Sequence, residues 1–170
     1  MLPREHRWCS KSGAHDAAKL GRSPAPNLVR VTELSDDVIA FLSEGTRTAM
    51  LGYVAADGRP LVAPVWFIVD DGQLAFNTGK DTAKGRALAR DPRVVICVDD
   101  PHPPYSFVQV QGVASLGEDP DDLVAIATRT GGRYMGADKA DEYGRRNGVP
   151  GELVVRVRPT KVIKAFDLAE

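Results

Sequence analysis

The segment formed by residues 61–69 constrains the fold more than any other part of the chain, because it is apolar on both of its alternating faces. Successive side chains of a β-strand point to opposite sides of the sheet, so both sides of this strand have to be covered. Closing the sheet into a barrel covers one side, and a second subunit or a flat ligand is a natural cover for the other. One face carries Leu61, Ala63, Val65 and Phe67, and the other carries Val62, Pro64, Trp66 and Ile68.

Turn residues around this segment predict a three-stranded antiparallel meander. Asp57-Gly58 is a strong hairpin turn between residues 46–55, which are rich in β-formers, and residues 61–69. The run Asp70-Asp71-Gly72 then predicts a second turn into a strand over residues 73–78.

The remaining elements indicate the fold class. Further strands are expected over residues 93–98, 105–116 and 152–166, and helices over residues 35–45, 81–90 and 121–130. Gly79 and the pair Gly131-Gly132 are interpreted as isolated turn glycines, not as a dinucleotide-binding G-x-G-x-x-G motif. About six antiparallel strands with two or three helices between them predict an α+β barrel rather than a doubly wound α/β fold.

Composition and charge limit the kinds of molecule that the protein is expected to bind. The 170 residues are 43% hydrophobic and carry a formal net charge of −1, whereas binders of nucleic acid or membrane surfaces normally have a large basic excess. No apolar run approaches the ~18 residues of a membrane span, and no apolar signal segment opens the chain, which predicts a cytoplasmic protein. Residues 1–27 are expected to be a loose basic leader, and residues 28–170 a single domain.

The cysteines and histidines do not suggest a metal site. Cys9 and Cys97 imply neither a disulfide framework nor a zinc site, and His6, His15 and His102 form no pair at metal-ligand spacing. His102 lies in a proline-rich loop, where an exposed histidine without a role is a simpler interpretation than a proton donor. No metal is expected.

Residues 76–88 carry the clearest chemistry, because a strand ends there at a glycine turn and leads directly into a helix. The free N–H groups and positive dipole of a helix start favour an anion such as a phosphate. Thr78 and Thr82 can add hydroxyl hydrogen bonds, and Lys84 and Arg86 can add positive charge.

A simpler interpretation of the same residues is structural. Asp81 or Thr82 would cap the helix, and the basic side chains would form a solvated face; spacing alone slightly favours this alternative. Trp66 and Phe67 favour the ligand-binding interpretation, since they could form the wall of a site for a planar ring beside the phosphate. Core packing of Trp66 stays open as the alternative.

Several of these segments, taken together in their order and spacing, carry a resemblance to a known family. They are residues 57–67, 77–86, 91–94, 104–107, 110–112 and 159–162. The chain from residue 34 to residue 167 resembles the pyridoxamine 5'-phosphate oxidase-like split barrels, and among them the flavin/deazaflavin oxidoreductases of the coenzyme F420-dependent type. The resemblance implies a split β-barrel of the FMN-binding kind. A homodimer is expected because a monomeric barrel would expose an apolar patch that includes Val62, Trp66 and Ile68.

The resemblance also implies a cofactor-binding site in three parts. The cofactor ring would face the backbone of Val62, Ala63, Pro64, Val65 and Trp66. The middle of the cofactor would lie against Asn77, Thr78 and Gly79, and its phosphate against Thr82, Ala83, Lys84 and Arg86. The second subunit would bring Tyr105, Ser106 and Phe107 to the ring. Relatives can carry arginine where this chain has Thr82, so Lys84 is expected to be the main phosphate ligand.

The sequence segments that carry the resemblance are most similar to the F420 branch, so coenzyme F420 is expected as the cofactor and FMN is the alternative. An F420-dependent oxidoreductase transfers a hydride between the reduced deazaflavin and a small electron-poor substrate, and needs no catalytic side chain. Tyr134 could protonate a developing anion or simply pack a helix end.

Three other functions stay open. They are an FMN-dependent oxidase or reductase of the pyridoxamine phosphate oxidase type, a non-catalytic binder of a flavin, F420 or a haem-like tetrapyrrole, and a structural dimer with an empty cleft. The acidic end of the chain, Asp167 to Glu170, argues against pyridoxamine phosphate as substrate, because its phosphate calls for a basic C-terminal cluster.

Overall fold

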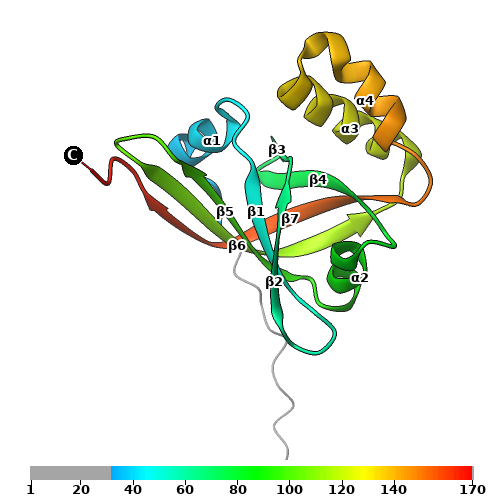
Figure 1. Ribbon diagram of the computed structural model, residues 1–170, viewed down its shortest axis with the longest axis horizontal. Helices are drawn as coiled ribbons and strands as arrows, with labels where there is room; N and C mark the ends of the chain where they lie inside the picture. Colours follow the sequence, from blue (N-terminus) through cyan, green and yellow to red (C-terminus); the bar gives the residue numbers. More distant parts are fainter. Residues whose placement is uncertain (1–31, 170) are drawn as a thin grey trace, which may run out of the picture.

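The computed structural model describes residues 32–169, which form one curved antiparallel sheet with helices around it (Figure 1). The expectations for the leader, Cys9, His6 and His15 lie outside the described residues. The strands are β1 (Ala49–Val54), β2 (Pro60–Val65), β3 (Ile68–Asp70), β4 (Gln73–Gly79), β5 (Arg93–Asp100), β6 (Ser106–Gly117) and β7 (Glu152–Ala165). The helices are α1 (Asp36–Ser43), α2 (Ala83–Arg90), α3 (Pro120–Met135), a short 3-10 turn η1 (Ala137–Lys139) and α4 (Ala140–Asn147).

The strand order shows that the sheet curls into a split barrel. The order is β2-β1-β5-β6-β7-β4-β3, and every pairing is antiparallel. β2 and β3 therefore form the two edges of the sheet, although only Trp66 and Phe67 separate them in the chain. Because two residues cannot span a flat sheet of seven strands, the edges must come together. The α+β split β-barrel predicted from the sequence is the observed fold class.

The predicted strand over residues 61–69 is wrong in one respect: it breaks into β2 and β3 at Trp66 and Phe67. Both predicted hairpin turns are present, one joining β1 to β2 and the other joining β3 to β4. The three-stranded meander is wrong, because these two hairpins lie at opposite edges of the sheet. Strand propensity is a local property, whereas the corner is required by the path of the chain from one edge to the other.

The two-faced character of β2 is confirmed for its own residues. Leu61 and Ala63 are partly buried and Val65 is buried, while Val62 and Pro64 are exposed. The inner side chains join a core that includes the fully buried Phe67. Ile68, expected on the uncovered face, is instead buried, because it lies after the corner in a second cluster covered by α3. That cluster contains Ile68, Ala75, Leu123, Ile126 and Val154.

Helices α3 and α4 form a close-packed hairpin, and α4 was not predicted from the sequence. Gly131 and Gly132 lie inside α3, so their interpretation as turn glycines is wrong. A Cβ atom added at Gly131 would lie 2.4 Å from Cβ of Tyr143, and one at Gly144 would lie 2.0 Å from Oγ1 of Thr128. These glycines are needed because they let the two helix backbones approach each other (Figure 1).

A charge cluster fixes α3 to the sheet through Asp122 and Arg129. Arg156 on β7 binds Asp122 at 2.5 Å and Asp70 at 3.1 Å, and Arg129 on α3 binds the same Asp70 at 2.5 Å. These guanidinium groups lower the pKa of both carboxyls below their ordinary values. None of the described helices is long and apolar enough to cross a membrane.

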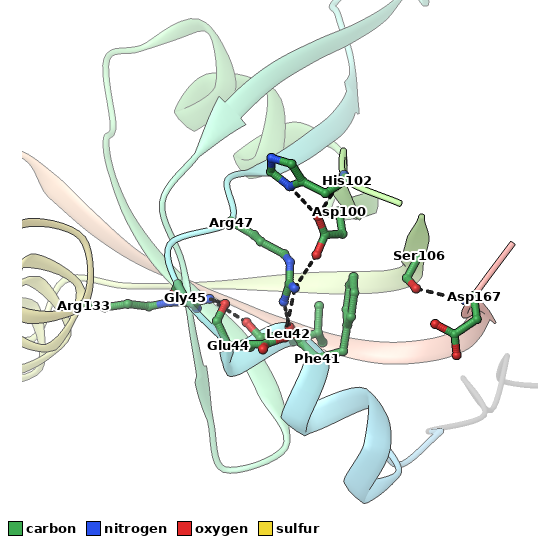
Figure 2. Close-up of polar contacts among 10 residues, drawn as sticks. All are labelled: Phe41, Leu42, Glu44, Gly45, Arg47, Asp100, His102, Ser106, Arg133 and Asp167. Atoms are coloured by element: carbon green, nitrogen blue, oxygen red, sulfur yellow. Dashed lines mark hydrogen bonds and ion pairs between the residues drawn. The ribbon is translucent and has the colours of Figure 1, made fainter. Parts of the chain in front are cut away.

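The second half of α3 holds the corner between β2 and β3. The guanidinium of Arg133 donates hydrogen bonds to the carbonyl oxygens of Phe67 at 2.9 Å, Gly45 at 2.9 Å and Leu42 at 2.7 Å. Its contacts with Gly45 and Leu42 appear in Figure 2. The hydroxyl of Tyr134 accepts from the Phe67 N–H at 3.3 Å and donates to the Arg47 carbonyl at 2.8 Å. Backbone groups that leave the sheet at the corner thus find partners on α3.

We expect Arg133→Met to lower the free energy of unfolding by about 2–4 kcal/mol, because three carbonyl oxygens lose a charged donor. Urea denaturation of both proteins measures the difference. Arg145→Met is the matched control: Arg145 is exposed on α4, and its loss should change stability by less than about 0.5 kcal/mol. Equal stability of the two variants would contradict the role assigned to Arg133.

Candidate functional site

A pocket of about 300 Å³ lies where β2 and β4 meet the α3–α4 hairpin. It brings together five of the residues expected at the cofactor site with residues that the sequence did not place there. The five are Pro64, Val65, Trp66, Asn77 and Lys84, and the helical hairpin adds Ala127, Thr130, Gly131, Tyr143 and Asn147. Its volume is at the lower end of the ~300–1,000 Å³ typical of ligand pockets, so it suits part of a cofactor-sized molecule.

Aromatic rings form one wall of this pocket. The indole of Trp66 stacks on the ring of Tyr134, with centroids 4.9 Å apart and planes 4° from parallel, and the ring of Tyr143 lies 6.1 Å away. Trp66 remains 39% exposed, so one side of it is available to a ligand. The Tyr134 hydroxyl is held by Phe67 and Arg47, and burial raises its pKa above the ordinary value. The packing interpretation of Tyr134 therefore fits the structure better than the proton donor does.

Two residues that line the pocket each have a buried polar atom without a hydrogen-bond partner among the described residues. The amide nitrogen of Asn77 donates to the Leu123 carbonyl at 3.3 Å, which leaves the buried Oδ1 without a donor. Thr130 is only 8% exposed, and its Oγ1 is also unpartnered. More than about 90% of buried polar groups in proteins are hydrogen-bonded, so two free atoms in one pocket point to a ligand.

The start of α2 supplies positive charge. Lys84 lies in the first turn of the helix and lines the pocket. Thr82 caps the helix: its hydroxyl accepts from the Gly85 N–H at 3.1 Å and donates to the Gly79 carbonyl at 2.7 Å. This is the structural role that the sequence left open for Thr82, and it leaves the hydroxyl no second proton to donate to an anion.

Arg86 and Thr78 are less directly placed. The exposed Arg86 donates to the Asp81 carbonyl and does not line the pocket. Thr78 is buried, with its hydroxyl 3.3 Å from that of Thr82. Lys84 is therefore the side chain of α2 that can reach an anion in the pocket.

Glu152 is a charged neighbour that the sequence did not indicate. It pairs with Gly79 across β4 and β7, and a Cβ atom added at Gly79 would lie 3.2 Å from the Glu152 carboxylate and 3.2 Å from the Thr82 side chain. Burial raises the pKa of Glu152, while the ammonium of Lys84 lowers it. An anion held by Lys84 would thus lie close to the carboxylate of Glu152.

The three residues expected to approach the cofactor from a second subunit do not line the pocket of their own chain. Tyr105, Ser106 and Phe107 lie beside the C-terminal end, where the Asp167 N–H donates to the Ser106 hydroxyl at 3.1 Å (Figure 2). That end lies far from the α3–α4 hairpin (Figure 1). Their approach to the ring of a partner's cofactor stays a prediction.

His102 is the exposed member of a polar group at the same end (Figure 2). Its Nδ1 lies 2.9 Å from Asp100, whose other oxygen binds Arg47 at 2.7 Å. Hydrogen bonds from Arg47 and His102 lower the pKa of Asp100 to about 2. His102 does not line the pocket.

The uncovered face of the sheet forms a second, broader hollow of about 860 Å³. Its lining is mostly apolar and comes from five neighbouring strands, β1, β2, β5, β6 and β7. Val62 is the most exposed large apolar side chain there, at 69%. β2 contributes to both hollows: Pro64 and Val65 line the pocket, and Pro60, Leu61 and Val62 line this face, while Ala63 lines neither.

Residues 34–165 match the family model of pyridoxamine 5'-phosphate oxidase. The chain belongs to the pyridoxamine 5'-phosphate oxidase family. No curated protein sequence matches it.

Solved structures share this fold. A conserved hypothetical protein of Mycobacterium tuberculosis superposes with a TM-score of 0.69 at 24% identity, over 82% of this chain and 90% of that one. A protein described as an F420 reductase gives 0.57 at 29% identity, over 73% of this chain and 94% of that one. A haem storage protein of Vibrio cholerae gives a TM-score of 0.62 at 20% identity, over 82% of this chain and 100% of that one.

The family resemblance located the strand and loop part of the pocket but not its helical part. Thr130, Tyr143 and Asn147 carry no motif, because they reach the pocket only when α3 packs beside the sheet and α4 folds back on α3. The one available sequence signal was the glycine spacing of Gly131 and Gly144, which allows close helix packing.

We expect Glu152→Gln to raise the melting temperature at pH 7 by roughly 1–2 °C. A carboxyl group whose pKa is raised on folding stabilises the folded state at pH values below 4.5, its pKa in the unfolded chain. This stabilisation is lost as the pH rises through the higher pKa of the folded state. The difference between the two proteins should therefore vanish near pH 4, where the glutamate is largely protonated. Thermal melts at both pH values test this. Glu118→Gln, at an exposed site paired with Lys80, is the control; a lower melting temperature for Glu152→Gln at pH 7 would contradict the assignment.

Proposed function

We propose that this family member is an oxidoreductase that binds coenzyme F420 at the interface of a homodimer and transfers a hydride between the reduced deazaflavin and a small electron-poor substrate. One observation carries the proposal. Lys84 and two unpartnered polar atoms share a pocket with Trp66, and the strand that leads to Trp66 also borders the large uncovered apolar face. A flat ring joined to a phosphate by a polar chain fits such a combination of surfaces.

Each part of the pocket would have its own task. Val62 and Pro64 on the outer face of β2, with Trp66 after the strand, would support the ring. Lys84 with the first N–H groups of α2 would hold the phosphate. When bound, the deazaflavin supplies the carbon that carries the hydride. The protein would orient the ring and exclude water from one side through the Trp66–Tyr134 stack, so no side chain has to act as nucleophile.

The choice of F420 over FMN rests on the sequence segments that resemble the F420 branch and on the F420 reductase at 29% identity. FMN remains the second candidate, since it also joins a ring to a phosphate. A haem-like tetrapyrrole is less well supported. Within residues 32–169 the only histidine is the exposed His102, outside the pocket.

We expect Lys84→Ala to weaken F420 binding roughly 10- to 100-fold, because a charge-assisted contact to the phosphate is lost. Titration of the purified protein with F420, and separately with FMN, can be followed by quenching of tryptophan fluorescence, to which Trp66 contributes. Lys139→Ala is the matched control, because Lys139 is an exposed lysine paired with Glu142 outside the pocket.

Three results of the titration decide between the candidate functions. Preference for F420 that is reduced in Lys84→Ala supports the proposal. Tighter binding of FMN transfers the function to an FMN-dependent oxidase or reductase. Binding of neither cofactor excludes both.

The homodimer is proposed from the uncovered sheet face. Val62 lies in a mostly apolar hollow of about 860 Å³, and soluble monomers rarely leave such a surface open to water. A two-fold partner on this face would cover it and could bring Tyr105, Ser106 and Phe107 towards the ring of the facing subunit.

We expect Val62→Asp to convert the dimer to a monomer and to weaken F420 binding, because a charge would be buried in the interface and the shared site would be lost. Size-exclusion chromatography with light scattering at micromolar concentration measures the mass. Val149→Asp, at another exposed valine in the loop before β7, should leave the dimer intact. A monomeric wild type would rule out the interface and the shared site together.

A further inference from the structure

Thr130 is the most informative unused group in the structure, because it is a buried hydroxyl that the fold leaves unsatisfied. A helical threonine commonly donates to the carbonyl one turn earlier, yet Thr130 makes no such bond and has no partner among the described residues. More than nine-tenths of the residue is buried, and it lines the pocket from α3. An unpaired buried hydroxyl costs stability, so a ligand partner would explain why it is tolerated.

Asn77 reaches the same pocket from β4, and the chemistry of its free atom is unambiguous. Because its nitrogen donates to the Leu123 carbonyl, the atom left for a ligand is Oδ1, which only accepts hydrogen bonds. Phosphate oxygens also accept and cannot satisfy it. Whatever lies beside Asn77 must therefore present an O–H or N–H donor.

The pocket thus separates two kinds of ligand chemistry. Lys84 offers a positive charge for an anion, whereas Asn77 and Thr130 offer an acceptor and a hydroxyl for an uncharged polar group. F420 and FMN each join the ring to the phosphate through a polyhydroxylated chain. At about 300 Å³ the pocket can hold this chain and the phosphate, while the ring needs the open face of β2.

We propose that Asn77 and Thr130 together bind the polyhydroxylated chain of the cofactor, which makes α3 a specificity-determining part of the binding site. The inference rests on the proposed function and extends it, because it names the residues that distinguish a hydroxylated ligand from the bare ring. It also gives the α3–α4 hairpin a role in binding. Close packing at Gly131, beside Thr130, keeps the helix in place against the pocket.

The test is Thr130→Val, which keeps the shape of the side chain and removes the hydroxyl. We expect its affinity for F420 to fall roughly 5- to 10-fold. The melting temperature of the ligand-free variant should rise by roughly 2–4 °C, because an unsatisfied buried hydroxyl is gone. Substitution of a purely structural residue would not weaken F420 binding and at the same time raise the melting temperature.

Two controls sharpen the experiment. Thr128→Val removes a hydroxyl from the same helix outside the pocket and should leave F420 affinity unchanged. Lumiflavin, which carries the flavin ring without the hydroxylated chain, should bind wild type and Thr130→Val equally well. The binding measurements use tryptophan fluorescence, and the stability measurements use thermal melts.

The outcomes separate this inference from the proposed function. If wild type binds F420 or FMN and Thr130→Val binds it equally well, the role of Thr130 is wrong and the proposed function stands. An equal loss of lumiflavin and F420 binding also overturns the inference, since the pocket as a whole would be disturbed. If wild type binds neither F420 nor FMN, both proposals are wrong.

Discussion

The corner at Trp66 and Phe67 is the constraint on which the rest of the structure depends. Without it the chain could not pass from one edge of the sheet to the other, and the barrel would not close around its core. A corner removes backbone groups from the ladder, and the side chains of Arg133 and Tyr134 replace those lost hydrogen bonds. The same contacts fix the position of Trp66, so barrel closure and the pocket wall share one set of interactions.

Helix α3 connects these two features. Its first half is fixed to the sheet by the charge cluster around Arg156, and its second half holds the corner. Between them, Thr130 faces the pocket. A side chain on a helix anchored at both ends is well suited to orient a ligand, because little conformational freedom is lost on binding.

The pocket shows the balance between stability and function that is common at binding sites. Two polar atoms are left without partners, and a carboxylate with a raised pKa lies beside the cation at the start of α2. A pocket shaped only for stability would replace these groups by apolar or paired ones. The two unpartnered atoms become favourable only when a ligand supplies the missing partner, and this links the stability of the ligand-free protein to its binding properties.

The sequence by itself determined the alternating faces of β2, the two hairpin turns, the capped start of α2 and, through family resemblance, five of the pocket residues. These features depend on neighbours in the chain, and local patterns report them well. The corner, the burial of Ile68, the helical position of Gly131 and the contribution of Thr130 and Tyr143 were decided only by tertiary structure. Each of these depends on contacts between segments far apart in the chain, which no local pattern encodes.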